Sequence, residues 1–286
     1  MARDMRRLRG AAFGVVMFIA TLAVLGFLVL PMVAIFARVP LHLLIDQLDD
    51  PIVRDALVLT GTANALALVV ILLFGTPTAY LLGTRHFRGR TLVITLVELP
   101  LVLPPTVAGI GLLAAFDGRI GLLSDILQPL KINVTFTTTA VVLAICFVAG
   151  PFYVRQAIAS FETLDQDILD AARVDGAGTL RLLLTISIPL ASTGLAAGAA
   201  LAFARGVGEF GATIMFAGNL RGTTQTLPLL IYQDFELNFD VALAIGALLV
   251  IISAAVLILV KGLARLPGRA RGADPAFLAS AVRPGA

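Results

Sequence analysis

The sequence predicts an all-α membrane protein with six transmembrane helices, on three observations. Of the 286 residues, 59% are hydrophobic and 14% are charged, whereas soluble domains carry about 25% charged residues. Six apolar runs are long enough to cross a bilayer, which takes about 20 residues of helix. The Lys and Arg residues are shared unevenly between two sets of connecting segments, as expected when the cytoplasmic loops are the more basic ones.

The first two runs are predicted to be long helices. Residues 11–37 carry no charge and follow four arginines within the first ten residues. A secretory signal also has a basic start and an apolar run. This run is too long for one and lacks a clear small-residue cleavage site, so we predict an uncleaved first helix. The second run, residues 56–84, is interrupted by Gly75 and Pro77.

The third run, residues 91–116, contains Pro100, Pro104 and Pro105. Prolines remove backbone donors and crowd the preceding turn. At membrane depth the freed carbonyls are tolerated only where protein or a water-filled cavity satisfies them. We therefore predict a break here, either a simple kink or a bend that borders a polar passage. The remaining spans are residues 132–154, the run after Ile186 to about Gly208, and residues 241–260.

Charge orients the chain. Fifteen of the 21 Lys and Arg residues lie in the N-terminus, residues 85–90, residues 155–181 and the C-terminal tail, and six lie in the segments between. The bias predicts that both termini and residues 162–192 face the cytoplasm. We expect a cytoplasmic N-terminus (1–10), a transmembrane domain (11–263) with a polar loop at 162–189, and a mobile cytoplasmic tail (264–286).

The polar loop holds five acids and two bases, so it cannot lie in hydrocarbon. It is predicted to be a helix, a turn and a second helix. Thr163 followed by Gln166 fits a capping box, with Thr163 as the N-cap. Gly176 and Gly178 supply the permissive backbone that a helix end and a turn need, and Pro189 suits the first turn of the next helix.

This loop resembles the EAA loop of bacterial ABC-importer permeases, which reads Glu-Ala-Ala, three residues, Gly, nine residues, Ile, any residue, Leu, Pro. The chain differs at two positions, Asp170 for Glu and Ile188 for Leu, and it keeps the spacing. In that family the loop docks into a cytoplasmic ATPase. The alternative is an ordinary polar loop. The resemblance implies coupling roles for a set of six residues: Asp170, Ala171, Ala172, Gly176, Ile186 and Pro189.

A second resemblance concerns cargo. Residues 208–232 are similar to molybdate and tungstate ABC permeases, whereas sulfate permeases usually diverge over 219–228. The Leu99–Pro105 run resembles the corresponding run of molybdate and sulfate permeases. The neutral polar side chains in residues 208–232 would hold an oxyanion without trapping it. The alternative is a solvated outer loop that packs on a binding protein. These neutral candidates are Thr213, Asn219, Thr224 and Gln225.

Few charges fall within the spans. Glu98 is the one acid well inside a span and is a functional candidate by default; the alternative is a position near the headgroups, paired with Arg85, Arg88 or Arg90. Arg205 and Glu209 are four residues apart on one helix and could pair. The pathway or gate candidates therefore also include Glu98, Pro104, Pro105, Arg205 and Glu209.

Several chemistries are excluded. Gly206–Gly211 reads G-x-G-x-x-G but follows a membrane helix rather than a strand, so it is no dinucleotide site. The sequence has no G-x-x-x-x-G-K-[ST] motif, only two distant histidines and the single Cys146. We therefore predict no catalytic residues, cofactor, metal site or intrachain disulfide. Gly194–Gly198 is a small-residue face and is predicted to serve helix packing.

Together the resemblances imply the permease subunit of an ATP-binding-cassette importer for molybdate, with the type I importer permease fold and a coupling helix between the fourth and fifth spans. They imply a homodimer in a bacterial inner membrane, with two ATPase subunits, a periplasmic or lipid-anchored oxyanion-binding protein and no nucleic acid. The cargo alternatives are tungstate and sulfate or thiosulfate. An ion-gradient transporter is the other class. It usually needs titratable groups near the midplane, which this chain almost lacks.

Overall fold

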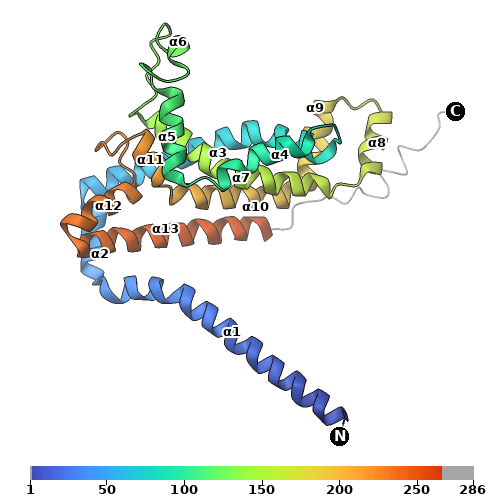
Figure 1. The fold of residues 1–286 in the computed structure, drawn as a ribbon, viewed down its shortest axis with the longest axis horizontal. Helices are drawn as coiled ribbons and strands as arrows, with labels where there is room; N and C mark the ends of the chain where they lie inside the picture. Colours follow the sequence, from blue (N-terminus) through green and yellow to red (C-terminus); the bar gives the residue numbers. More distant parts are fainter. Residues whose placement is uncertain (1, 266–286) are drawn as a thin grey trace, which may run out of the picture.

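The computed structural model describes residues 2–265, and its side chains over residues 13–259. Over that range the chain forms helices and no strands (Figure 1). The elements are α1 (Ala2–Arg38), α2 (Leu41–Asp49), α3 (Pro51–Thr84), α4 (Arg90–Glu98), η1 (Leu99–Leu101), α5 (Pro105–Phe116), α6 (Ser124–Leu127), α7 (Thr138–Glu162), α8 (Gln166–Val174), α9 (Thr179–Leu182), η2 (Leu183–Ser187), α10 (Ile188–Val207), α11 (Gly211–Phe216), α12 (Leu227–Leu237) and α13 (Phe239–Arg265).

Five helices of the described chain are long and apolar enough to cross a membrane, and the number is six when a bent pair of helices is counted as one span. The pair is Arg90–Leu101 with Pro105–Phe116, which meet at 109°. Pro104 is the N-cap of α5 and Pro105 its first residue, so neither missing N–H removes a helical hydrogen bond there. The six predicted spans and the proline bend in the third are therefore confirmed.

The helices α3 and α10 pack against α7, and α13 packs against α10 (Figure 1). In the most apolar segment of α7, 56% of the residues are buried within the chain. The corresponding share is 28% in α3, in α9–α10 and in α13, and it is zero in α1. Figure 1 shows α8 and α9 at one end of the body and α2, α11 and α12 at the other, and we call these the α8 end and the α12 end. The segment α5–α6 stands away from the body as an arm, and α1 diverges from it.

Small residues let α10 approach α7 closely. A Cβ added at Gly194 would lie 2.0 Å from the Ser160 hydroxyl, and one at Gly198 would lie 3.1 Å from the Gln156 Cβ. Side chains at these glycines would push the two helices apart. The predicted packing role of Gly194–Gly198 is thus confirmed.

Two predicted boundaries need correction. The second span is not interrupted, because α3 runs unbroken through Gly75 and Pro77, and Gly75 makes room for the Tyr153 ring. The fourth span begins at Thr138 and ends at Glu162, rather than covering 132–154, so Arg155 lies inside the helix. The predicted tail, 264–286, lies outside the described residues from position 266 on.

Candidate functional site

The polar loop predicted to contact an ATPase, residues 162–189, forms the α8 end (Figure 1). Asp165 caps α8, with its carboxylate accepting from the Asp167 N–H at 2.9 Å. The predicted capping box is therefore wrong: Thr163 ends α7 instead and donates to the Ser160 carbonyl at 2.9 Å. The reason is that α7 extends to Glu162, and Asp is a better N-cap than Thr.

One side of α8 is anchored and the other is free. The side chain of Leu169 is fully buried in the main hydrophobic core. Asp170 and Ala171 are exposed, and the Asp170 carboxylate pairs with Arg173 one turn on. Ala172 is half-buried. The motif residues thus lie on a short helix that is fixed to the body on one side and open on the other.

The turn after α8 needs only one of its two glycines. Gly176 has φ +82°, which L side chains rarely adopt, whereas Gly178 has φ −66°. Ile186 lies in the π-helical turn η2 and is half-buried against the core. Pro189 lies in the first turn of α10, as predicted. The loop leads through η2 directly into a membrane helix.

Arg205 and Glu209 form the predicted pair near the α12 end. Their side chains are 2.8 Å apart, and Glu209 is almost completely buried. The other carboxylate oxygen accepts from the Ala212 N–H at 2.8 Å. Glu209 therefore both neutralises Arg205 and caps the start of α11, which fixes α11 to the end of α10.

Of the neutral candidates near the same end, Thr213, Thr224 and Gln225 are buried and Asn219 is half-buried. Thr213 and Thr224 are fully buried. The side-chain amides of Asn219 and Gln225 both donate to the Gln233 Oε1, at 3.2 and 2.9 Å. The structure thus brings Asn219 and Gln225 together through Gln233, a residue that no local sequence signal identified. In this conformation these side chains hold the loop before α12 together.

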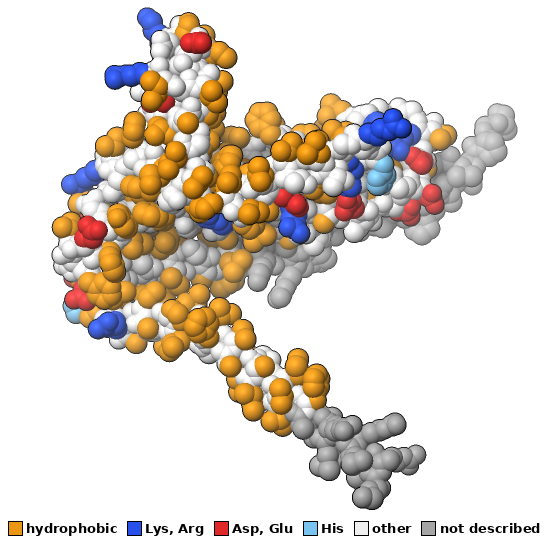
Figure 2. All heavy atoms as spheres, viewed as in Figure 1, with side chains coloured by type: hydrophobic (Ala, Val, Ile, Leu, Met, Phe, Trp, Pro, Cys, Tyr) orange, Lys and Arg blue, Asp and Glu red, His pale blue; other side chains and the backbone are white. Residues whose placement is uncertain are grey.

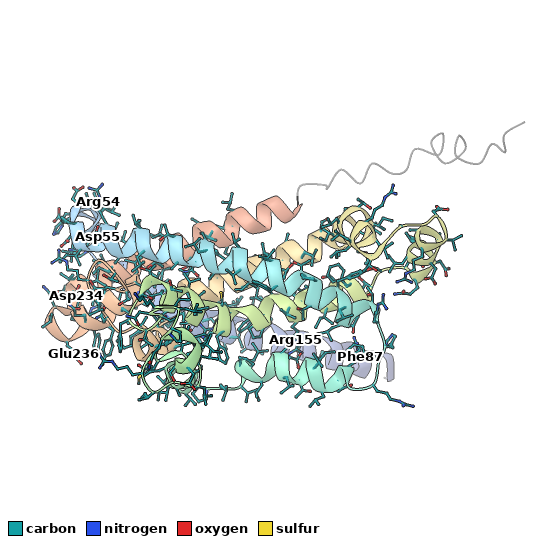
Figure 3. All side chains as sticks on the ribbon, turned by 90° about the horizontal axis from the view of Figure 1, so that it is seen from above. Arg54, Asp55, Phe87, Arg155, Asp234 and Glu236 are labelled. Carbon is teal, nitrogen blue, oxygen red and sulfur yellow. The ribbon has the colours of Figure 1, made fainter. Side chains whose placement is uncertain are left out.

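Glu98 does not pair as expected. It ends α4, and its carboxylate lies 3.5 Å from Arg155 on α7. Of the three arginines expected to neutralise it, Arg90 pairs instead with Glu162. Figure 3 shows Arg155 part-way along the body, away from the charged side chains labelled at the α12 end (Arg54, Asp55, Asp234 and Glu236).

Comparison with known proteins identifies the family. Residues 75–269 match the family described as "Binding-protein-dependent transport system inner membrane component". The chain belongs to this family. The permease is 38% identical over 241 residues to the molybdenum transport system permease protein ModB of Mycobacterium tuberculosis, covering 84% of this chain and 91% of that protein. It is 34% identical over 217 residues to the molybdate/tungstate transport system permease protein WtpB of Pyrococcus abyssi, covering 74% and 80%.

The fold agrees with the family. The permease resembles a chain in the crystal structure of a bacterial alginate ABC transporter in complex with an alginate pentasaccharide-bound periplasmic protein. The TM-score is 0.72 at 16% identity, and the match covers 93% of this chain and 98% of that one. The permease is therefore a multi-pass membrane protein with the type I importer permease fold predicted from its sequence.

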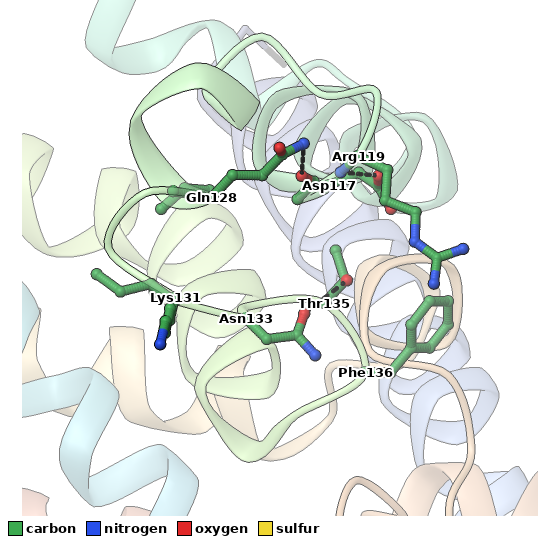
Figure 4. A pocket seen from close by; sticks show the side chains of 10 residues that line it. Asp117, Arg119, Gln128, Lys131, Asn133, Thr135 and Phe136 are labelled. Atoms are coloured by element: carbon green, nitrogen blue, oxygen red, sulfur yellow. Dashed lines mark hydrogen bonds between the residues drawn. The ribbon is translucent and has the colours of Figure 1, made fainter.

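The permease also carries a pocket on the arm of α5 and α6 (Figure 4). The cavity is about 580 Å³ and is lined by the cations Arg119 and Lys131 together with Asp117. The Asp117 carboxylate accepts from the N–H groups of Arg119 and Ile120, and these two hydrogen bonds hold its pKa below the ordinary value of 3.8. Figure 2 shows basic side chains at the tip of this arm, with an acidic one near them.

Proposed function

We propose that this permease is the membrane-spanning subunit of an ATP-binding-cassette importer that carries molybdate into the cytoplasm. The observation that carries the proposal is the Asp170–Pro189 loop at the α8 end, in which Asp170, Ala171 and Gly176 are exposed. The two relatives, both above 30% identity and named for molybdenum or molybdate and tungstate, support the cargo. A separate ATPase subunit would hydrolyse the ATP.

We infer that the α8 end faces the cytoplasm. Arg85, Arg88 and Arg90 precede or begin α4 at that end, and Arg173 and Arg181 lie on α8 and α9. Short cytoplasmic loops carry the excess of Lys and Arg. The α12 end and the α5–α6 arm then face the outside of a bacterial inner membrane, where a binding protein would dock.

We infer that the permease works as a homodimer with two ATPase subunits and an oxyanion-binding protein. The span Phe13–Arg38 buries none of its apolar window in this chain, and its contacts are chiefly with α13. A helix that is apolar on all sides and unpacked needs other surfaces around it. Lipid and a second copy of the chain would provide them.

The mechanism follows from how α8 is fixed. Closure of the ATPases on ATP would draw the two α8 helices together. The buried side chains of Leu169 and Leu182 join α8 and α9 to the same core as α7, so a shift of the loop moves the membrane helices. The passage between the two copies would then open toward the binding protein, which would release molybdate into it. Hydrolysis of ATP would return the permease to the conformation that is open to the cytoplasm.

Uptake by reconstituted vesicles tests this function. The permease is combined with its cognate ATPase and binding protein, and molybdate, tungstate and sulfate are offered separately. We expect ATP-dependent molybdate uptake that tungstate competes with. Uptake that persists without the ATPase and collapses with a protonophore would instead indicate an ion-gradient transporter.

Two variants test the docking role. Gly176→Pro and Asp170→Lys should abolish association with the ATPase, because one distorts the turn and the other reverses a charge on the free side of α8. Both should still insert into the membrane. Normal co-purification of the ATPase with either variant would contradict docking at this loop.

A further inference from the structure

The central helix α7 has an open face that differs from every other exposed membrane face of the described chain. The helices α1, α3, α4, α10 and α13 all expose large hydrophobic side chains. Over its full length, Thr138–Glu162, α7 exposes none. Lipid-facing surfaces are apolar, so the open face of α7 is not built to meet lipid.

Over residues 155–163 the accessible side chains on one face of α7 are polar or small and follow helical spacing, whereas Val142, Leu143, Phe147 and Phe152 nearer its start are apolar and half-buried. Arg155 and Ala159 are exposed, Gln156 and Ser160 are half-buried, and Thr163 is exposed at the end of the helix. Four of these residues, Gln156, Ala159, Ser160 and Thr163, line a groove of about 390 Å³. We call the five residues the α7 stripe. It leads from Arg155 along α7 to the α8 end.

The far wall of the groove comes from α10. Leu190, Thr193 and Gly194 line it there, and the close approach at Gly194 brings the two helices together at its base. The groove is therefore formed by two membrane helices and is lined by a hydroxyl or amide side chain at most of its α7 positions. The groove thus carries hydroxyl and amide groups from α7 among apolar and small residues, between two helices that are long and apolar enough to cross a membrane.

Arg155 is the charged residue at the end of the α7 stripe that lies farthest from the α8 end. It lies seven residues before the end of α7, about 10 Å of helical rise from Glu162. Its side chain is 69% exposed, and its one ion-pair partner is Glu98, at 3.5 Å. Charge-assisted hydrogen bonds are normally about 2.7–2.9 Å long, so this pair is loose.

The other arginines paired between or within the spans are held more firmly. Arg90, 19% exposed, pairs with Glu162 and also donates to the Leu82 carbonyl at 2.6 Å. Arg205, 28% exposed, pairs with the buried Glu209 at 2.8 Å. Both stabilise helix packing within the chain. Arg155 alone of the three presents its guanidinium to open space.

We propose that Arg155 is an anion-binding station in the transport pathway and that the α7 stripe is the pathway's cytoplasmic half. Charged side chains inside a membrane face a bundle interior or a water-filled cavity, and Arg155 does not face the interior of its own chain. The inference rests on the proposed function, which supplies the oxyanion and the second copy of the chain.

Charge supports a tetrahedral dianion as the ligand. In a homodimer two copies of Arg155 bring two positive charges to one pathway, which match the two negative charges of such an anion. Glu98 neutralises each guanidinium while the pathway is empty, and the anion displaces it. Because the Glu98 pair is loose and exposed, the exchange costs little, and the anion is held without being trapped.

Uptake and labelling test the proposal together. In the uptake assay above, Arg155→Gln should lower the ATP-dependent molybdate rate at least tenfold, and Arg155→Lys should retain more activity than Arg155→Gln. The exposed Arg88, in the α3–α4 linker, gives a matched loss of one charge, and Arg88→Gln should transport at the wild-type rate. Each variant is checked for association with the ATPase, so that a folding or docking defect is recognised.

Labelling gives a readout that does not depend on transport. In a Cys146→Ser background, Arg155→Cys should react with a membrane-impermeant, anionic thiol reagent supplied at the cytoplasmic face, and molybdate should slow the reaction. Val69→Cys, on the lipid-facing side of α3, is the control and should not react. An Arg155→Cys that reacts as slowly as Val69→Cys overturns the proposal.

The outcomes separate the two claims. If the wild-type chain carries no oxyanion with ATP, the proposed function fails. If the wild type transports and Arg155→Gln transports within about twofold of it, a difference of less than about 0.5 kcal/mol, then the function stands and the assignment of Arg155 is wrong.

Discussion

The turn between α8 and α9 offers a test in which two neighbouring glycines differ in one property only. Gly176 has φ +82° and Gly178 has φ −66°. A Cβ added at either position meets nothing within 4 Å, so Gly176→Ser and Gly178→Ser introduce no clash within the chain. The left-handed conformation costs a non-glycine residue about 1–2 kcal/mol, and this strain applies at Gly176 alone. Ser is also a favoured residue at Gly178, the N-cap of α9.

If the free Gly176→Ser variant relaxes the turn and the ATPase binds only the conformation seen in the structure, restoring that conformation adds the strain to the free energy of binding. A cost of about 1–2 kcal/mol corresponds to an affinity loss of roughly 5- to 30-fold for Gly176→Ser. Gly178→Ser should shift affinity by less than about 0.5 kcal/mol, as surface substitutions usually do. The assay is titration of the nanodisc-embedded permease with purified ATPase, with thermal unfolding as the check on folding.

Equal losses of ATPase affinity in the two variants would mean that the ATPase contacts the added hydroxymethyl groups and that its affinity does not depend on the backbone conformation of the turn. No loss for Gly176→Ser would mean that the turn is not part of the docking surface. Either result would refute the argument from backbone conformation.

Three further predictions concern packing and charge. Gly109→Ala should lower the melting temperature strongly and Gly111→Ala should not, because a Cβ at Gly109 would lie 2.6 Å from a backbone oxygen of α11 while Gly111 is open; overpacking costs about 1–3 kcal/mol. Arg205→Ala should destabilise the permease by about 3–5 kcal/mol, because it leaves the Glu209 carboxylate buried without its ion-pair partner. Adding Glu209→Gln should restore most of the lost stability, as measured by thermal unfolding. A double variant no more stable than Arg205→Ala would contradict this prediction. Burial, and secondarily a neighbouring carboxylate, raises the pKa of Asp234 above 3.8, so its contribution to stability is present below pH 3.8 and is lost as the pH rises through the raised value. Asp234→Asn should therefore melt higher than the wild type at pH 7 but not at pH 3.5.

Features with a local cause could be predicted from the sequence. The spans follow from the thickness of the bilayer, and the bend after α4 follows from prolines that lack N–H groups. The pair of Arg205 and Glu209 follows from their four-residue spacing, although α10 ends at Val207 and Glu209 lies just beyond it. The positive φ of Gly176 follows from the need to end α8 and reverse the chain. None of these depends on distant parts of the chain.

Features set by tertiary contacts could not be predicted. A charge at Arg155 seemed to end the fourth span, but the helix continues to Glu162 with that side chain exposed and 3.5 Å from Glu98 on α4. The partner of Asn219 and Gln225 is Gln233 on α12, and no periodicity reveals a hydrogen bond between a loop and the following helix. Leu169 anchors α8 only because the loop folds back onto the body.

The central claim is that an ATPase binds α8 in the cytoplasm. Labelling of a cysteine at Gln166, the first residue of α8, tests this claim most directly. In a Cys146→Ser background, Gln166→Cys is exposed to a membrane-impermeant thiol reagent in vesicles of both orientations, with and without the ATPase. The account predicts reaction only in inside-out vesicles and protection when the ATPase is bound. Reaction in right-side-out vesicles would put the loop on the wrong side of the membrane and contradict the account.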